Sequence, residues 1–185
     1  MRRRNILSIA AFLILAGCFI STGDLIKPAD ADYPVADGTH FAIYSLLADG
    51  TRAGNTPDKA VVTRKDGFYV MTMTESPNKT GLEGNVMTGL MKAFETGLYA
   101  VMVQDPEKPG HNLYMLARKD GARWLRWDLV CPDFVNLAEE NGVTVASMGV
   151  TIVSSDCEVK DFASLTKAMR FVHENKKPDW EYVVE

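Results

Sequence analysis

Residues 60–74, AVVTRKDGFYVMTMT, decide the fold, because Asp66-Gly67 separates two runs rich in β-branched, aromatic and long apolar side chains. Asp-Gly between two such runs is the strongest short-range signal for a β-hairpin with a two-residue turn. The letters Arg-Lys-Asp-Gly return at 118–121, flanked by residues 112–117 and 122–130. The sequence therefore predicts two hairpins. Basic residues beside an Asp-Gly turn are common, so we interpret the repeat as a shared turn and not as a duplication.

A two-residue turn fixes which residues of a hairpin lie opposite each other, and therefore which side chains share a face. The predicted pairs are Lys65–Phe68, Val62–Met71 and Ala60–Met73 in the first hairpin, and Lys119–Ala122, Leu116–Leu125 and Tyr114–Trp127 in the second. We expect the inner face of the sheet to carry Val62, Met71, Met73, Leu116, Leu125 and Trp127.

The opposite face of the second hairpin is only half polar, since it carries Met115, Ala117, Trp124 and Arg126. Such a face is either covered by another element or used for binding. Tryptophan and arginine are enriched where protein interfaces bind most tightly, whereas packing against Met115 and Ala117 across the strands is the alternative. We take Trp124, Arg126 and Met115 as a candidate binding patch.

The segment between the two hairpins admits two interpretations. Val86, Leu90, Met91 and Phe94 fit one face of a helix, but Gly89 lies inside that pattern and weakens it. A period-two pattern instead predicts a strand that the turn at 95–97 joins to a second strand at 98–104. We favour this third hairpin, with the helix at 85–95 as the alternative. Upstream, residues 40–47 predict a strand that ends before Asp49-Gly50.

The last third of the chain predicts two helices. Asp133 can cap a short helix that runs to Glu140 and ends before Gly142, and residues 143–153 are β-like with a break at Gly149. Asp161 can cap a longer helix with one apolar stripe, made of Phe162, Leu165, Met169 and Val172.

After Pro178, Trp180, Tyr182 and Val183 indicate a closing strand. We therefore predict an α+β fold over residues 39–185. It is an antiparallel β-rich domain of hairpins, sandwich-like or an open barrel, with one short and one longer C-terminal helix packed on the sheet.

The first eighteen residues have the composition of a secretory signal. Arg2, Arg3 and Arg4 precede an apolar run over 6–16. A membrane-spanning helix needs roughly 20 apolar residues, more than this run provides. The run ends in Leu15-Ala16-Gly17-Cys18, which resembles the lipobox of bacterial lipoproteins. The resemblance covers only this segment.

The resemblance implies that residues 1–17 are cleaved and that Cys18 becomes the first mature residue, diacylated on its thiol and usually acylated on its amino group. Phe19 follows, where retention at the inner membrane favours Asp, so the resemblance implies an outer-membrane anchor facing the periplasm in an organism that has that membrane. Residues 3–7 also fit a loose twin-arginine pattern, although general export is the preferred route. Residues 18–38 have low hydrophobicity and carry Pro28, Asp30, Asp32, Pro34 and Asp37 in short succession, and they predict a flexible lipidated tether.

Composition argues against nucleic-acid binding. Removal of three of the 20 basic side chains with the signal leaves 17 against 24 acidic ones, a formal net charge of −7. Nucleic acids and anionic membrane surfaces select clustered Lys and Arg, so we expect neither as an electrostatic partner. The 46% apolar fraction is that of an ordinary globular domain.

Acylation of Cys18 leaves Cys131 and Cys157 as an even pair in an oxidising compartment. We predict a disulfide between them, since no Cys-x-x-Cys pair supports a metal site.

No catalytic motif, metal site or cofactor site is predicted from the sequence. The chain lacks Gly-x-Ser-x-Gly, Walker, Gly-x-Gly-x-x-Gly and His-Glu-x-x-His patterns. His40, His111 and His173 are scattered. Met71-Thr72-Met73 admits a copper-handling role, but core packing is the preferred interpretation.

Three classes of function follow. The preferred one is a lipid-anchored, non-enzymatic module that binds an envelope protein or glycan through an exposed patch at Trp124 and Arg126. The second is a periplasmic carrier of a small apolar ligand, which requires a cavity of a few hundred Å³ lined by Tyr69, Met71, Met73 or Leu125. The third is an envelope hydrolase, which requires a histidine beside a carboxylate or hydroxyl group.

Overall fold

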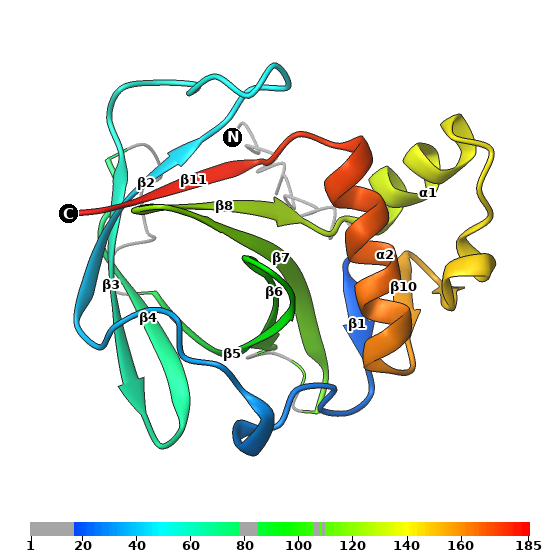
Figure 1. Ribbon diagram of the computed structural model, residues 1–185, viewed down its shortest axis with the longest axis horizontal. Helices are drawn as coiled ribbons and strands as arrows, with labels where there is room; N and C mark the ends of the chain where they lie inside the picture. Colours follow the sequence, from blue (N-terminus) through cyan, green and yellow to red (C-terminus); the bar gives the residue numbers. More distant parts are fainter. Residues whose placement is uncertain (1–16, 78–84, 106–107, 109) are drawn as a thin grey trace, which may run out of the picture.

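A computed structural model describes residues 17–77, 85–105, 108 and 110–185. The centre of the molecule is a closed antiparallel barrel of eight strands (Figure 1). In order around the barrel, these are β2 (Thr39–Ser45), β3 (Asp58–Lys65), β4 (Phe68–Glu75), β5 (Val86–Glu95), β6 (Leu98–Gln104), β7 (Asn112–Asp120), β8 (Arg123–Asp128) and β11 (Trp180–Val184). The predicted antiparallel β-rich fold with two helices is confirmed. The barrel is closed, neither open nor sandwich-like, because β11 pairs with β8 on one side and with β2 on the other.

A smaller layer covers one side of the barrel (Figure 1). Strand β1 (Phe19–Ser21) pairs with β7 and with β10 (Asp156–Val159), and β10 pairs with β9 (Val150–Val153). Beside these strands lie α1 (Cys131–Glu140), α2 (Phe162–Asn175) and two short 3₁₀ turns, η1 (Pro28–Asp30) and η2 (Val145–Met148).

The first hairpin has the predicted register. Lys65 lies opposite Phe68, Val62 opposite Met71 and Ala60 opposite Met73. Asp66 and Gly67 both have positive φ, 51° and 80°, which is the backbone that a two-residue turn of this type requires.

The predicted register of the second hairpin is wrong. The turn moves one residue along, to Gly121 and Ala122, and Asp120 lies opposite Arg123. The reason is that Gly121, with φ of 62°, takes the first turn position, and not the second. Leu116 consequently lies opposite Trp127.

Residues 86–95 form a strand, so the favoured hairpin interpretation is confirmed and the helix alternative is wrong. Strand β5 turns through Thr96 and Gly97 into β6. Gly89 has a packing role there, because a Cβ at this position would lie 2.3 Å from the carbonyl oxygen of Met102 on β6. The glycine that weakens a helix lets two strands approach closely.

The predicted cap of the longer helix is confirmed, since the Asp161 side chain accepts a hydrogen bond from the Ser164 amide at 2.7 Å. The short helix begins earlier than predicted. It starts at Cys131 with Val130 in the cap position, because Pro132 suits the first turn of a helix. The expected strand at 143–153 is correct only in its last part, since residues 145–148 form η2.

The side chains form two separate apolar cores. One lies inside the barrel, and the other lies between the outer face of β5–β8 and the layer that contains α2 and β1. Leu116 and Trp127 belong to the outer core, while Val62 and Met71 belong to the interior. The prediction that these four share one inner face is therefore wrong. Both faces of the second hairpin are buried, so burial alone does not distinguish them.

Cys131 and Cys157 form the predicted disulfide, with Cα atoms 5.2 Å apart. The bond joins the first residue of α1 to β10, and both cysteines are buried in the outer core.

Residues 18–38 do not form the predicted tether. Phe19 and Ile26 are fully buried in the outer core, and Phe19 makes an edge-to-face contact with Phe134 at 4.8 Å between ring centroids. A few isolated apolar residues anchor this segment in the core. Its overall composition is polar, so the sequence did not predict that the segment is folded. The predicted signal, apart from Gly17, lies outside the described residues. Among the helices of the described chain, none is both long and apolar enough to cross a bilayer.

Candidate ligand-binding site

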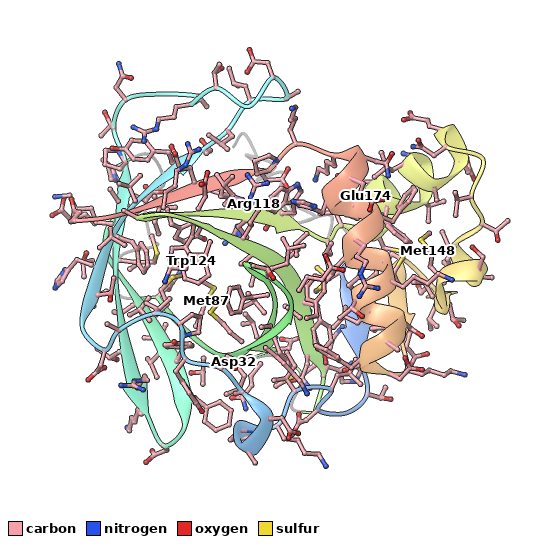
Figure 2. All side chains as sticks on the ribbon, viewed as in Figure 1. Asp32, Met87, Arg118, Trp124, Met148 and Glu174 are labelled. Carbon is pink, nitrogen blue, oxygen red and sulfur yellow. A yellow bond between two sulfur atoms is a disulfide. The ribbon has the colours of Figure 1, made fainter. Side chains whose placement is uncertain are left out.

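The interior of the barrel holds a cavity of about 130 Å³ that is partly open to solvent and whose lining atoms are almost all apolar. All eight strands of the barrel contribute methionine, valine or aromatic side chains to its lining. The lining residues are Val35, Phe41, Val62, Tyr69, Met71, Met87, Thr88, Gly89, Leu90, Met91, Val101, Val103, Met115, Ala117, Trp124, Leu125, Arg126 and Tyr182. In Figure 2 the labelled Met87 and Trp124 lie within the ring of strands, while Met148 lies on the helical side of the molecule.

Residues 32–38, which we call the strap, cross from β5 to β3. The Asp32 amide donates to the Met91 carbonyl at 2.8 Å, and the Gly38 amide donates to the Val62 carbonyl at 2.9 Å. Between these two points Val35 lines the cavity. The strap therefore borders the cavity with a segment that precedes the first barrel strand in the sequence.

Tyr69 locks the middle of the strap. Its hydroxyl group donates to the Val35 carbonyl and accepts from the Val35 amide, each at 2.9 Å. Burial raises the pKa of Tyr69, so the neutral phenol, which can both donate and accept, is the form that holds Val35.

Arg126 is the charged residue among the described residues that line the cavity. Its Nη1 donates to the Tyr182 hydroxyl group, and its Nη2 lies 2.9 Å from Asp128 Oδ1. The guanidinium also lies over the Trp180 ring, 4.9 Å from its centroid. Trp180 Nε1 donates to the other oxygen of Asp128 at 2.7 Å, which orients the carboxylate.

One nitrogen of the Arg126 guanidinium has no hydrogen-bond acceptor among the described residues. Arg126 Nε is buried and has no hydrogen-bond partner within the described part of the chain. Tyr182 beside it is partly buried, and this burial raises its pKa against the lowering effect of Arg126. The phenol is therefore neutral, and the Arg126–Asp128 pair carries no net charge.

The structure brings the predicted patch residues together, but not on the surface. Trp124 is only 6% exposed and contacts Tyr99 in a tilted ring pair with centroids 5.3 Å apart. Trp124, Arg126 and Met115 all line the cavity. The prediction of an exposed patch is wrong, because this face of the hairpin is the inside of a closed barrel.

The residues predicted to line the cavity of a carrier agree better with the structure than the predicted surface patch does. Tyr69, Met71 and Leu125 line the cavity, whereas Met73 does not. Sequence reasoning missed Met87, Met91 and Tyr182. The alternation of Met87, Gly89 and Met91 along β5 was a usable signal for a shared face, but nothing local indicated that this face points into a cavity.

His173 lies outside the cavity. Its Nε2 is 3.3 Å from Arg118 Nη1, and its ring contacts Trp127 at 5.2 Å between centroids. Burial, then the Arg118 charge, lowers its pKa. Within the described residues, no group of three or more His, Cys, Asp and Glu side chains could hold a metal ion.

Cys18 is half-buried at the start of β1. Its amide donates to Asp156 Oδ1 at 2.9 Å, and the residue forms an isolated bridge with Val130, just past the end of β8. Burial, followed by the negative charge of Asp156, raises the pKa of its thiol. Cys18 therefore lies beside the same end of β8 that carries Arg126 and Asp128.

No protein-family model, curated protein or solved structure shows a significant match to this chain.

Proposed function

We propose that this protein is a lipid-anchored envelope protein that binds one small apolar molecule inside its barrel. The observation that carries the proposal is the cavity itself, which lies inside the ring of strands, partly open to solvent, and is lined almost entirely by apolar atoms. Barrels of eight strands have an interior just wide enough to be filled by side chains or to hold one small ligand. Here the side chains leave part of the interior unfilled.

The size of the cavity limits the ligand. An apolar cavity of roughly 150 Å³ stays dry and binds benzene, and the cavity here has a similar volume of about 130 Å³. This is smaller than the few hundred Å³ expected of a carrier. The ligand, or the part of it that is buried, is therefore about one aromatic ring or a short aliphatic chain in size.

The same observation favours binding inside the barrel over binding at a surface patch. A surface module needs Trp124 accessible to a partner, and Trp124 is buried inside the barrel. Binding in the cavity uses Trp124, Arg126 and Met115 together, because all three line it. The envelope location and the lipid on Cys18 rest on the lipobox resemblance, and the position of Cys18 beside the end of β8 would hold this part of the barrel close to the bilayer.

Methionine methyl groups provide a direct test. With [¹³C]methyl-methionine in the protein, titration with toluene should shift the signals of Met71, Met87 and Met115, which line the cavity. The signals of Met102 and Met148, which are buried in the outer core, should stay in place.

A pair of variants localises the binding. Val62 on β3 lines the cavity, and its neighbour Val61 does not. Val62→Phe should fill the cavity and abolish the toluene-induced shifts, while Val61→Phe, the same change on the other face of the strand, should preserve them. Equal shifts in both variants, or no shift of the cavity methionines in the unmodified protein, would refute binding in the barrel.

A further inference from the structure

The unpaired nitrogen of Arg126 is the most informative atom of the cavity. A buried donor without an acceptor costs about 1–3 kcal/mol, and native proteins contain few of them. The other two nitrogens of the guanidinium are already used by Tyr182 and Asp128. Arg126 is therefore held on two sides, and Nε is the guanidinium nitrogen that has no partner among the described residues. Because Nε is buried, a ligand oxygen reaches it only with a small shift of the side chain.

The charge around Arg126 is already balanced. Asp128 lies 2.9 Å from Nη2 and is itself oriented by Trp180. Tyr182 is a neutral phenol at physiological pH, since burial raises its pKa. A carboxylate ligand would add an uncompensated negative charge near Asp128 in an apolar cavity, and burying such a charge is costly.

A purely hydrocarbon ligand is also a poor match. It would fill the apolar space but leave Nε without an acceptor. A neutral acceptor oxygen satisfies the Nε donor without adding charge.

We infer that the cavity binds a neutral, mostly apolar molecule that carries one hydrogen-bond-accepting oxygen, such as a ketone, aldehyde or ester carbonyl, which accepts from Arg126 Nε. This inference deepens the proposed function and rests on it. The apolar lining binds the body of the ligand, and Arg126 selects its single polar atom.

Three molecules of similar shape test the inference: acetophenone, α-methylstyrene and benzoate. The first carries a carbonyl oxygen, the second replaces that oxygen with a methylene group, and the third is an anion. Dissociation constants come from the cavity methionine signals at pH 7. A hydrogen bond to a charged donor contributes about 1.5–3 kcal/mol, so the preference for acetophenone over α-methylstyrene should fall about tenfold or more in Arg126→Met.

Acetophenone and α-methylstyrene differ in hydration. This difference cancels when the ratio of their two affinities is compared between the unmodified protein and Arg126→Met. Val61→Phe serves as the control, since it leaves the cavity lining unchanged, and its ratio should equal that of the unmodified protein.

A measurement on the unmodified protein tests the inference even if the Arg126→Met variant does not fold. The ¹H–¹⁵N signal of Arg126 Nε should move to higher proton frequency when acetophenone binds and should not do so with α-methylstyrene.

The outcomes separate the two claims. If α-methylstyrene and acetophenone both shift the cavity methionines but the affinity ratio and the Nε signal are insensitive to the oxygen, the inference is wrong and the proposed function stands. Tightest binding by benzoate would overturn the requirement for a neutral ligand. If none of the three moves the cavity methionines, the proposed function fails as well.

Discussion

Replacing Phe19 by alanine tests whether the chain before the barrel belongs to the folded body. Phe19 is fully buried, follows directly after Cys18, and packs edge-to-face on Phe134. Truncating a buried phenylalanine to alanine costs about 3–5 kcal/mol, of which the aromatic contact accounts for about 0.5–1.5 kcal/mol. Native domains are stable by only about 5–15 kcal/mol, so this loss is a large part of the total.

The assay is urea unfolding and thermal unfolding, each followed by circular dichroism, on the chain from residue 18 with Cys18→Ser to remove lipidation. For a domain of this size, a loss of 3–5 kcal/mol lowers Tm by about 6–20 °C. Ile20→Ala is the matched control, because Ile20 lies next in the same strand but is only half-buried. We expect it to cost about 1 kcal/mol.

A flexible tether predicts a different result. Substitutions in a solvated segment usually change stability by less than about 0.5 kcal/mol. If Phe19→Ala and Ile20→Ala both fall within that range, β1 is not part of the folded body and our account of residues 18–38 is wrong.

Three further predictions use other parts of the fold. Replacing both Cys131 and Cys157 by alanine should destabilise the protein by about 3 kcal/mol in urea unfolding, and a reductant should then have no additional effect. Asp161 has its pKa lowered by the hydrogen bonds from Ser164, so its stabilising effect is present above its unfolded pKa and lost as pH falls through the folded value. Asp161→Ala should therefore lower Tm at pH 7, and the difference from the unmodified protein should shrink as pH falls below about 4 and vanish below the lowered folded pKa, whereas a constant difference would contradict the cap. In cells, Cys18→Ala should abolish incorporation of labelled fatty acid and release the protein from the membrane fraction, and retention of either property would exclude Cys18 as the anchor.

Local signals in the sequence predicted local structure well. Asp66-Gly67 specified both the turn and the register of the first hairpin, since both residues tolerate positive φ. Asp161 specified the start of α2 through a single hydrogen bond. The same dipeptide at Asp120-Gly121 predicted the wrong register for the second hairpin. A glycine suits either position of a two-residue turn, and the neighbouring strands decide which position it takes.

The site depends on long-range structure and was harder to predict. Alternation along β8 places Trp124 and Arg126 on one face, but both faces of β8 are buried, one by the barrel and one by α2. Only closure of the barrel by β11 makes the face with Trp124 an interior. The strap was missed for a related reason, since Val35 alone on a polar segment carries no periodicity.

The position of β11 in the chain has a consequence for how the barrel assembles. Trp180 pairs with Ser45 and with Arg126, so the last described strand fills the gap between β2, the first barrel strand, and β8. Until it docks, β2 and β8 each present an unpaired strand edge, the kind of surface that recruits other chains. Contacts between such distant parts of a sequence form slowly, because loop-closure entropy must be overcome first. Aggregation during folding should therefore concentrate in chains that lack residues 180–184, even where every other strand is intact.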